Sequence, residues 1–217
     1  MILVPVKNLS GAKQRLAALF DQSTRTELAR AMLFDVLETL GTWTDRPEVS
    51  VVTSDPFAIQ LARHYCFSLI PDNANRSQTD AIEMASRVCE AQGVDSTLVI
   101  PGDIPLVQSW ELEKILQSAP AEGSVLVRAA DGRGTNAIWR RPVGLFPARF
   151  GNDSFAPHHA TAQATGKPCV LLSLPGIALD IDNSSDLRAL AAAPGETRAQ
   201  RLVRQWQVDD FPVAANE

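Results

Sequence analysis

The sequence lacks the features of a membrane-spanning or disulfide-stabilised protein. No apolar run approaches the ~20 residues that cross a bilayer. Residues 1–6 are apolar, but they are too short for the core of a secretory signal and no basic segment precedes them. The three cysteines, Cys66, Cys89 and Cys169, are far apart and form no CxxC pair. We therefore expect no disulfide framework and no zinc site, and predict a protein of the reducing cytoplasm.

An excess of positive charge is also missing. The chain has 20 Lys and Arg against 25 Asp and Glu, for a formal net charge of −5. This balance argues against nucleic-acid binding driven by bulk charge, although a local basic pocket remains open. The length of 217 residues allows one large domain or two small ones, and 45% hydrophobic residues are typical of a soluble globular protein.

No P-loop is present, because GxxxxGK[ST] occurs nowhere in the chain. A different basic loop follows the predicted first strand, Ile2–Val6, and contains Lys7, Lys13 and Arg15 together with Gly11. Backbone N–H groups at the start of a helix, combined with nearby cations, are well suited to bind an anion. We interpret the loop as an anion site, and the alternative is a solvated basic loop.

Strands and helices alternate over the first 120 residues. Predicted strands cover residues 2–6, 49–53, 67–70 and 97–100. Predicted helices begin at Ser23 or Thr24, at Pro56, at Thr79 or Asp80, and at Ser109, and Gly41 is expected to end the first of them. This alternation favours right-handed crossovers and predicts a doubly wound α/β fold, with a mostly parallel sheet and helices on both faces.

The fourth predicted strand, Thr97–Ile100, leads directly to a carboxylate. Its β-branched, apolar residues are typical of a buried central strand. Asp103 follows its carboxyl end and lies between Pro101 and Pro105, which restrict the backbone. Open α/β sheets bind ligands at this edge, so Asp103 is a candidate metal ligand. The alternative is a turn residue that bonds its own backbone.

The pattern changes after residue 120. Strands are predicted at 124–129, 137–140 and within 167–174, with turn-rich loops at 131–136 and 150–154. Small residues in these loops, Thr135, Gly151 and Ser154, could form a pocket for a small anion, although two plain turns fit the composition as well. His158 and His159 are adjacent on a predicted helix and point about 100° apart, so they cannot share one metal.

A second pair of acids occurs near the end of the chain. Asp180 and Asp182 lie on one face if their segment is extended, and Ser184 or Ser185 is expected to begin the next helix. With Asp103, either acid would complete the two carboxylates that a Mg²⁺ site needs. A last helix is predicted at 196–206 and a frayed tail at 209–217.

Five segments together resemble one known family, the guanylyltransferases of coenzyme F420 biosynthesis (CofC/FbiD). They are Pro5-Val6-Lys7 with Ala12–Leu16, Pro101–Leu106, Asp131–Ala137, Phe150–Ser154 with a following histidine, and Leu179–Asp182 with Asp186-Leu187. Each motif alone is weak, but all five occur in the family's order across residues 1–190. The resemblance is therefore specific.

The resemblance implies a nucleotide-diphospho-sugar-transferase-like fold and a Mg²⁺-dependent reaction. GMP would pass from GTP to 2-phospho-L-lactate, phosphoenolpyruvate or 3-phospho-D-glycerate, with release of pyrophosphate. A downstream lactyl transferase would use the product, and a homodimer remains open. One domain is expected, with a nucleotide-binding half at 1–120, an acid-substrate half at 121–190 and a C-terminal helix and tail at 191–217.

The resemblance also implies roles for particular residues. Metal ligands would be Asp103 with Asp180 or Asp182, and the catalytic groups would be Lys13, Arg15 and Asp103. The expected nucleotide-binding residues are Lys7, Lys13, Arg15, Ser54, Thr79 and Asp80. The expected acid-binding residues are Thr135, Gly151 and Ser154.

The sequence departs from the family at one place. The family's G-L-N-x-A-[LI] helix start is replaced by Ser77–Ile82, a change that concerns the nucleotide contacts. Two alternatives follow. The first is a nucleotidyltransferase of the same fold with another nucleotide or acceptor, although the L-A-G-G-x-G-x-R loop of molybdopterin and sugar-phosphate nucleotidyltransferases is absent. The second is a nucleotide-binding module without activity.

Overall fold

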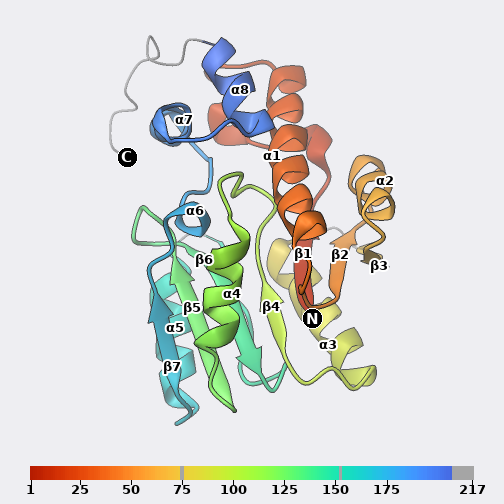
Figure 1. The fold of residues 1–217 in the computed structure, drawn as a ribbon, viewed down its shortest axis with the longest axis vertical. Helices are drawn as coiled ribbons and strands as arrows, with labels where there is room; N and C mark the ends of the chain where they lie inside the picture. The colour runs from red at the N-terminus through yellow and green to blue at the C-terminus, as the bar shows by residue number, and fades with distance from the viewer. Residues whose placement is uncertain (74–75, 152, 207–217) are drawn as a thin grey trace.

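The computed structural model describes residues 1–73, 76–151 and 153–206 and contains one seven-stranded sheet (Figure 1). The strand order is β3-β2-β1-β4-β6-β5-β7. The strands are β1 Ile2–Val6, β2 Val49–Thr53, β3 Ser68–Ile70, β4 Thr97–Val99, β5 Gly123–Arg128, β6 Thr135–Arg141 and β7 Cys169–Leu172. The α/β class predicted from the sequence is confirmed.

Strand direction brings distant loops to one edge of the sheet. β1 pairs in parallel with β2 and β4, and β3 with β2. β6 is antiparallel to both of its neighbours, β4 and β5, while β5 and β7 are parallel. The predicted central position of β4 is confirmed, but its parallel pairing holds on one side only. Because β6 runs the opposite way, its first residues lie at the edge where β1, β4 and β5 end.

Helices cover both faces of the sheet. They are α1 Gln22–Thr42, α2 Pro56–His64, α3 Gln78–Ala91, α4 Ser109–Gln117, α5 Phe155–Ala164, α6 Pro175–Ala178, α7 Ser184–Ala192 and α8 Arg198–Gln205, with 3₁₀ turns η1 Leu9–Gly11 and η2 Gln14–Leu16. In Figure 1, α1, α4 and α6 lie in front of the sheet and α3 and α5 behind it. The four-residue helix α6 replaces the simple turn expected at Pro175-Gly176.

The core is divided by the sheet into two layers. Ile2 and Val4 face the larger core, which includes the buried side chains of α1, whereas Leu3 packs with α3 on the opposite face. This is the alternation expected of a strand covered on both sides. All five residues of β1 are buried, so the loop that follows begins from a rigid support.

Several helix starts differ from those predicted by one to three residues. The capping residues are Asp21 for α1, Ser77 for α3, Gln108 for α4, Asn183 for α7 and Thr197 for α8. For α1, α3 and α7 the cause is local, because several Ser, Thr, Asp and Asn residues stand together and only one of them is the cap. Gly41 lies inside α1 rather than ending it. The absence of a side chain there makes room for the ring of Tyr65, which a Cβ would overlap.

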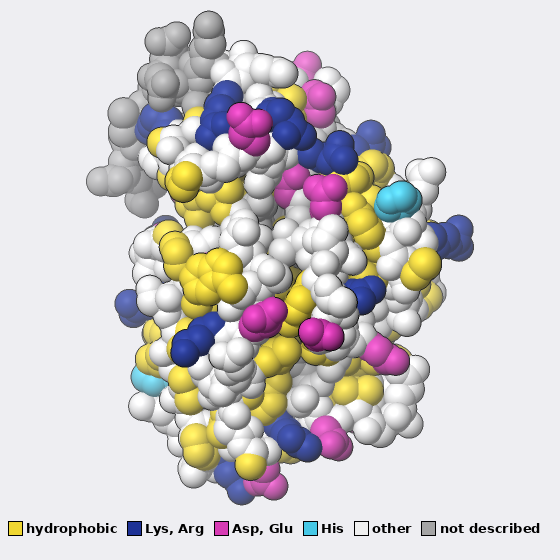
Figure 2. Space-filling model, in the orientation of Figure 1, with side chains coloured by type: hydrophobic (Ala, Val, Ile, Leu, Met, Phe, Trp, Pro, Cys, Tyr) yellow, Lys and Arg dark blue, Asp and Glu magenta, His cyan; other side chains and the backbone are white. Residues whose placement is uncertain are grey.

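Charged side chains of both signs are interspersed on the described part of the face shown in Figure 2. Across the described ranges, no helix is both long enough and apolar enough to cross a bilayer. Residues 207–217, which include the predicted tail, lie outside the part of the chain that the structure describes.

Candidate functional site

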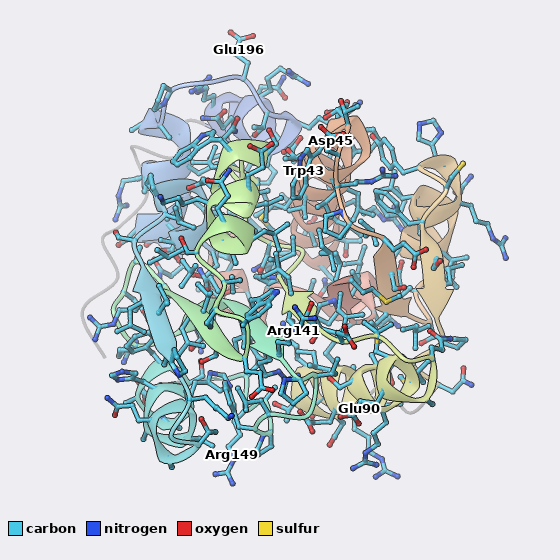
Figure 3. The ribbon with its side chains drawn as sticks, turned by 60° about the horizontal axis from the view of Figure 1, so that its bottom comes forward. Trp43, Asp45, Glu90, Arg141, Arg149 and Glu196 are labelled. Atoms are coloured by element: carbon cyan, nitrogen blue, oxygen red, sulfur yellow. The ribbon has the colours of Figure 1, made fainter. Side chains whose placement is uncertain are left out.

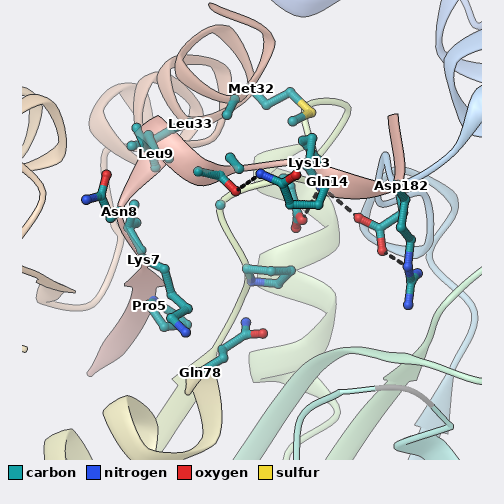
Figure 4. Close-up of a pocket in the computed structure, with 18 residues that line it drawn as sticks. Pro5, Lys7, Asn8, Leu9, Lys13, Gln14, Met32, Leu33, Gln78 and Asp182 are labelled. Atoms are coloured by element: carbon teal, nitrogen blue, oxygen red, sulfur yellow. Dashed lines mark hydrogen bonds and ion pairs between the residues drawn. The ribbon is translucent and has the colours of Figure 1, made fainter. Parts of the chain in front are cut away.

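Two cavities meet at the edge where β1, β4 and β5 end. The larger, of about 600 Å³, is lined by the loop after β1, by Pro101–Asp103 and by residues of α1 (Figure 4). The smaller, of about 230 Å³, is lined by the loop after β5, the start of β6 and the segment before α5. Five residues line both: Arg15, Gln78, Pro101, Asp103 and Asp182. Two ligands placed in these cavities would therefore meet at the carboxylates.

Lys13 bridges two carboxylates in the wall that the cavities share. Its Nζ lies 2.6 Å from Asp103 Oδ2 and 2.9 Å from Asp182 Oδ1, and Arg15 contacts Asp182 Oδ2 at 2.9 Å. The Lys13 side chain is only 7% exposed, while its backbone has a φ of 54°. A lysine in this left-handed region is strained, so the surrounding contacts hold it there. The predicted catalytic residues Lys13, Arg15 and Asp103 are thus adjacent.

The ion pairs control the charge states in this wall. Burial alone would lower the pKa of Lys13, but the charges of Asp103 and Asp182 outweigh it and raise that pKa. Burial would likewise raise the pKa of Asp182, and the charges of Lys13 and Arg15 reverse the effect and lower it. Lys13 and Asp182 therefore remain charged at neutral pH, although the Lys13 side chain has little contact with water.

Asp180 has different surroundings from Asp182. Burial, together with the nearby charge of Asp103, raises the pKa of Asp180 to about 6, against the opposing effect of a hydrogen bond from Asn136. That bond joins Asn136 Nδ2 to Asp180 Oδ1 at 3.0 Å. Both acids line the smaller cavity, although their segment is not the extended strand that the sequence analysis considered.

The backbone around the two acids is fixed by side chains. Asn136 Nδ2 also donates to the carbonyl oxygens of Ile177 (3.0 Å) and Ala178 (2.9 Å). Asp186 Oδ2 accepts from the N–H groups of Asp182 (2.8 Å) and Asn183 (2.9 Å). The carboxylates are therefore held in place before any ligand binds, which is how binding geometry is made precise.

A buried glutamate anchors α6, which precedes these acids. Glu111 Oε1 accepts from Gly176 N at 2.8 Å and Oε2 accepts from Gln108 N at 3.0 Å. Burial raises the pKa of Glu111, and the N–H donors oppose that rise. A Cβ at Gly176 would overlap both Glu111 Oε2 and the carbonyl oxygen of Leu106.

We expect Gly176→Ala to lower the free energy of unfolding by about 1–3 kcal/mol, because neither the carboxylate nor the backbone can move away cheaply. Urea denaturation of the variant measures this loss. Gly11→Ala is the matched control, since a Cβ at Gly11 would meet nothing within 4 Å. Equal stability of the two variants would contradict the close packing around α6.

The far wall of the smaller cavity contains the predicted anion-binding residues. Thr135, Gly151 and Ser154 all line it. Thr135 N donates to Ser154 Oγ at 3.0 Å, and His158 Nδ1 lies 3.0 Å from Thr135 Oγ1. Of the two adjacent histidines, only His158 is buried against this wall. The hydroxyls and the nearby backbone can supply hydrogen bonds to a small anion.

The other expected nucleotide-binding residues are placed differently. Lys7 lines the larger cavity, and its Nζ donates to the carbonyl oxygen of Arg76 at 2.8 Å. Ser54, Thr79 and Asp80 are absent from the described lining of both cavities. Ser54 Oγ donates to Asp72 O, Thr79 Oγ1 donates to Phe150 O, and Asp80 contacts Ser77. These bonds support the loops beside the cavities.

Sequence reasoning did not single out Gln78 or Asn136. Gln78 is the first residue of α3 and lines both cavities, and Asn136 fixes Asp180. The sequence contained a signal for each residue, because Gln78 lies in the segment that departs from the family pattern and Asn136 lies within the Asp131–Ala137 motif.

Oxygen donors for a cation are present, although few in number. Among the described residues, no group of three His, Cys, Asp or Glu side chains is arranged to hold a metal ion. Asp103 and Asp180 interact electrostatically, and both line the smaller cavity. Two carboxylates suit a hard divalent cation that completes its coordination with phosphate oxygens and water.

Comparisons with known proteins agree with this geometry. A family model described as "Guanylyl transferase CofC like" matches residues 1–215. A phosphoenolpyruvate guanylyltransferase of Roseiflexus castenholzii is 35% identical, with 94% of this chain and 93% of that protein aligned. A 2-phospho-L-lactate guanylyltransferase of Methanothermobacter thermautotrophicus is 29% identical, with 94% and 89% aligned.

Among solved structures, the chain resembles a protein from Desulfovibrio desulfuricans that is described as a nucleotide-diphospho-sugar transferase. The TM-score is 0.76 at 17% identity, and the match covers 95% of this chain and 94% of that one. At this identity the likeness supports the fold alone. It agrees with the architecture that the sequence resemblance implied.

Proposed function

This chain belongs to the CofC-like guanylyl transferase family, and we propose that it transfers GMP from GTP to a small phosphorylated three-carbon acid in the synthesis of coenzyme F420. Pyrophosphate is the second product. The observation that carries the proposal is the wall shared by the two cavities, which contains Asp103, Asp182 and Arg15. A reaction between two phosphate-bearing ligands needs such a meeting point.

We assign the larger cavity to GTP and the smaller one to the acid. The larger cavity is built mainly from the half at residues 1–120, including the basic loop with Lys7, Lys13 and Arg15. The smaller cavity takes most of its lining from residues 129–182 and includes Thr135, Gly151 and Ser154. Its volume of about 230 Å³ fits a three-carbon acid better than a nucleotide.

The reaction needs no general base from the protein, because a phosphate oxygen of the acid is already ionised at neutral pH. That oxygen forms a bond to the α-phosphorus of GTP, and the bond from the α-phosphorus to the oxygen bridging to the β-phosphorus breaks. Both electrons of the broken bond leave with pyrophosphate. The residues therefore position the reactants and stabilise charge. We assign Lys13 and Arg15 to the charge that develops on pyrophosphate.

Asp103 and Asp180 are the carboxylates that we assign to a divalent cation, with Mg²⁺ as the expected ion. When bound, such an ion would neutralise charge on the reacting phosphates. Asp182 is assigned a different task, because its two oxygens already contact Lys13 and Arg15. Asp182 would hold the two cations in place.

Phosphoenolpyruvate is the acid to test first. The relative named for phosphoenolpyruvate is 35% identical to this chain, and the relative named for 2-phospho-L-lactate is 29% identical. The two acids have similar sizes, and a small difference in an apolar group discriminates weakly. 2-Phospho-L-lactate and 3-phospho-D-glycerate therefore belong in the same experiment.

The test is pyrophosphate release by the full chain with GTP, Mg²⁺ and each acid in parallel. Including the downstream lactyl transferase and its deazaflavin acceptor traps an unstable product. We expect release that requires GTP, the cation and one of the three acids. Release without an acid would indicate GTP hydrolysis and would contradict the assignment of the smaller cavity.

If no pyrophosphate is released with GTP, the same assay is repeated with ATP, CTP and UTP. Activity with one of these would show that the chain uses another nucleotide. The Ser77–Ile82 segment, which departs from the family pattern, would then be the first place to look for the cause. If the folded protein binds GTP but turns over no nucleotide, the alternative of a nucleotide-binding module replaces the enzyme.

A further inference from the structure

His158 occupies a position that the proposed chemistry does not explain. The side chain is 1% exposed and lies behind the wall of the smaller cavity, without lining the cavity itself. Its ring packs edge-on against Phe150, with centroids 5.2 Å apart. Both ring nitrogens have polar neighbours: Nε2 lies 2.7 Å from Arg149 N, and Nδ1 lies 3.0 Å from Thr135 Oγ1.

The contact with Arg149 fixes the tautomer of the imidazole. A backbone N–H is a donor only, so Nε2 must accept and cannot carry a proton. The proton of the neutral ring therefore resides on Nδ1, and Nδ1–H donates to Thr135 Oγ1. The Arg149 side chain points outward into solvent in Figure 3, so only its backbone makes this inward contact.

The neutral ring is also the favoured one. Burial, together with the charges of Arg140 and Arg149, lowers the pKa of His158 to about 4. A charged imidazolium would place an N–H on Nε2 directly against the Arg149 N–H, so geometry and charge favour the same state. The Nδ1–H tautomer therefore persists at neutral pH.

The direction of this hydrogen bond determines what Thr135 can do. A hydroxyl has one proton to donate. Because Thr135 Oγ1 accepts from His158, its own O–H remains available as a donor. Thr135 lines the smaller cavity, so that donor can reach a ligand there. If the bond ran the other way, the hydroxyl proton would be used inside the protein and an oxygen lone pair would face the ligand.

The hydroxyl of Ser154 is also left free to donate, because its oxygen accepts a hydrogen bond from the protein. Its Oγ accepts from Thr135 N at 3.0 Å, which leaves the Ser154 O–H available as a donor. Each of the two hydroxyl oxygens thus accepts a hydrogen bond from within the protein, and both residues line the same cavity. A wall that presents donors attracts carboxylate or phosphate oxygens and disfavours groups that can only donate.

We propose that His158 is a positioning residue that, through its Nδ1–H, holds the Thr135 hydroxyl as a hydrogen-bond donor toward the anionic acid. This role rests on the proposed function, because the ligand is the acid of that reaction. His158 itself touches no reactant. It determines which partner of the Thr135 contact donates, and thereby the affinity for an anion.

Two substitutions separate the functions of the two ring nitrogens. The amide nitrogen of Asn lies near the position of Nδ1, so His158→Asn keeps a donor for Thr135. The longer Gln reaches the position of Nε2, so His158→Gln can accept from Arg149 N and loses the donor to Thr135. Both variants lose the ring and its contact with Phe150, and Asn is one methylene smaller than Gln, so lost packing alone would affect His158→Asn at least as strongly as His158→Gln.

We expect His158→Gln to raise KM for the acid by about 10- to 100-fold, as expected for weakening a hydrogen bond to a charged group. KM for GTP should not change, and His158→Asn should stay within a few-fold of wild type. Thr135→Val should raise KM for the acid by a similar factor, and adding His158→Gln to it should have little further effect. His159→Gln, at the adjacent position, is the control.

An equal rise in KM for the acid in His158→Asn and His158→Gln would overturn the proposal, because both would then report lost packing. A parallel rise in KM for GTP, or full additivity with Thr135→Val, would do the same.

The tautomer of His158 can also be measured independently of enzyme activity, by ¹⁵N NMR of the imidazole nitrogens in the protein without ligands. The chain has three histidines, and the His158 signals are identified by their loss in His158→Asn. A protonated Nδ1 and an unprotonated Nε2 are expected, and a protonated Nε2 would overturn the proposal. If wild type turns over no acid, the proposed function fails, whereas this measurement still decides the orientation of the bond.

Discussion

Asp103→Asn should lower the rate of GMP transfer by about 10³-fold or more and leave the fold intact. The substitution keeps the shape of the side chain and removes its charge. Asp103 lies in the wall that both cavities share, beside Lys13 and near Asp180. If a divalent cation is held there, losing one of its two carboxylates removes several kcal/mol of charge stabilisation, which corresponds to this change in rate.

Stability should change far less than activity. Burial is the main cause of the raised pKa of Asp180, and the charge of Asp103 raises it further. The substitution therefore relieves a repulsion while it removes an ion pair with Lys13. Lys13 also keeps its contact with Asp182. The Asp103 side chain is 32% exposed, and pairs of this kind contribute little net stability, so we expect a change within about 1 kcal/mol.

The measurement is pyrophosphate release over a range of Mg²⁺ concentrations, together with urea denaturation. Asp95→Asn is the matched control, because Asp95 precedes β4 and Asp103 follows it. Asp95 pairs with Arg141 at the surface, at the opposite end of the strand. We expect normal rates from the control. If Asp103→Asn turns over within tenfold of the wild-type rate and requires the same Mg²⁺ concentration, Asp103 is not a metal ligand or a catalytic group.

The framework of this site was readable from the sequence because local signals agreed with one another. Thr97–Ile100 is a short β-branched run that ends in Pro-Gly, and a buried strand ending before Asp103 is the structure that it forms. The basic loop after β1 could then be placed near Asp103, since neighbouring parallel strands end at the same edge.

Other parts of the site depend on contacts between residues far apart in the chain, which the local sequence pattern does not reveal. β6 begins at Thr135, two residues before the start predicted, because its antiparallel partner β5 extends it into the polar loop, where Arg128 pairs with Thr135. α6 has four residues, too few to show a helical period. Its position depends on Glu111, which is 65 residues earlier in the chain.

Asp180 and Asp182 could not be distinguished for a similar reason. Alternation treats them as equivalent, and the difference between them is made by distant partners. Asp182 contacts Lys13, 169 positions away, and Asp180 contacts Asn136, 44 positions away. The same holds for His158 and His159, since only the folded chain shows which one reaches Thr135.

Lys13→Met should have two separable effects, on catalysis and on stability. We expect the rate of GMP transfer to fall by about 10²- to 10³-fold, by analogy with the loss of one group that stabilises a developing negative charge. We also expect a loss of about 2 kcal/mol of unfolding free energy. Breaking a fully buried pair costs about 3–5 kcal/mol, and the loss is smaller here because Asp103 and Asp182 are about one-third exposed.

A second variant separates the two effects. In Lys13→Met, the carboxylates of Asp103 and Asp182 lose the cation between them, and their mutual repulsion destabilises the fold. Lys13→Met combined with Asp182→Asn removes one of these charges, so at least half of the lost stability should return. The rate should not return, because the cation assigned to the leaving pyrophosphate is still missing.

Lys167→Met is the matched control for stability, because Lys167 pairs with Glu122 at the surface and such an exposed pair should contribute little to stability. Urea denaturation and pyrophosphate release are measured on all four proteins, including wild type. If the double variant regains both stability and rate, Lys13 only neutralises the carboxylates and has no further part in catalysis. If it regains neither, Asp182 itself is needed, and its contact with Arg15 is the next to test.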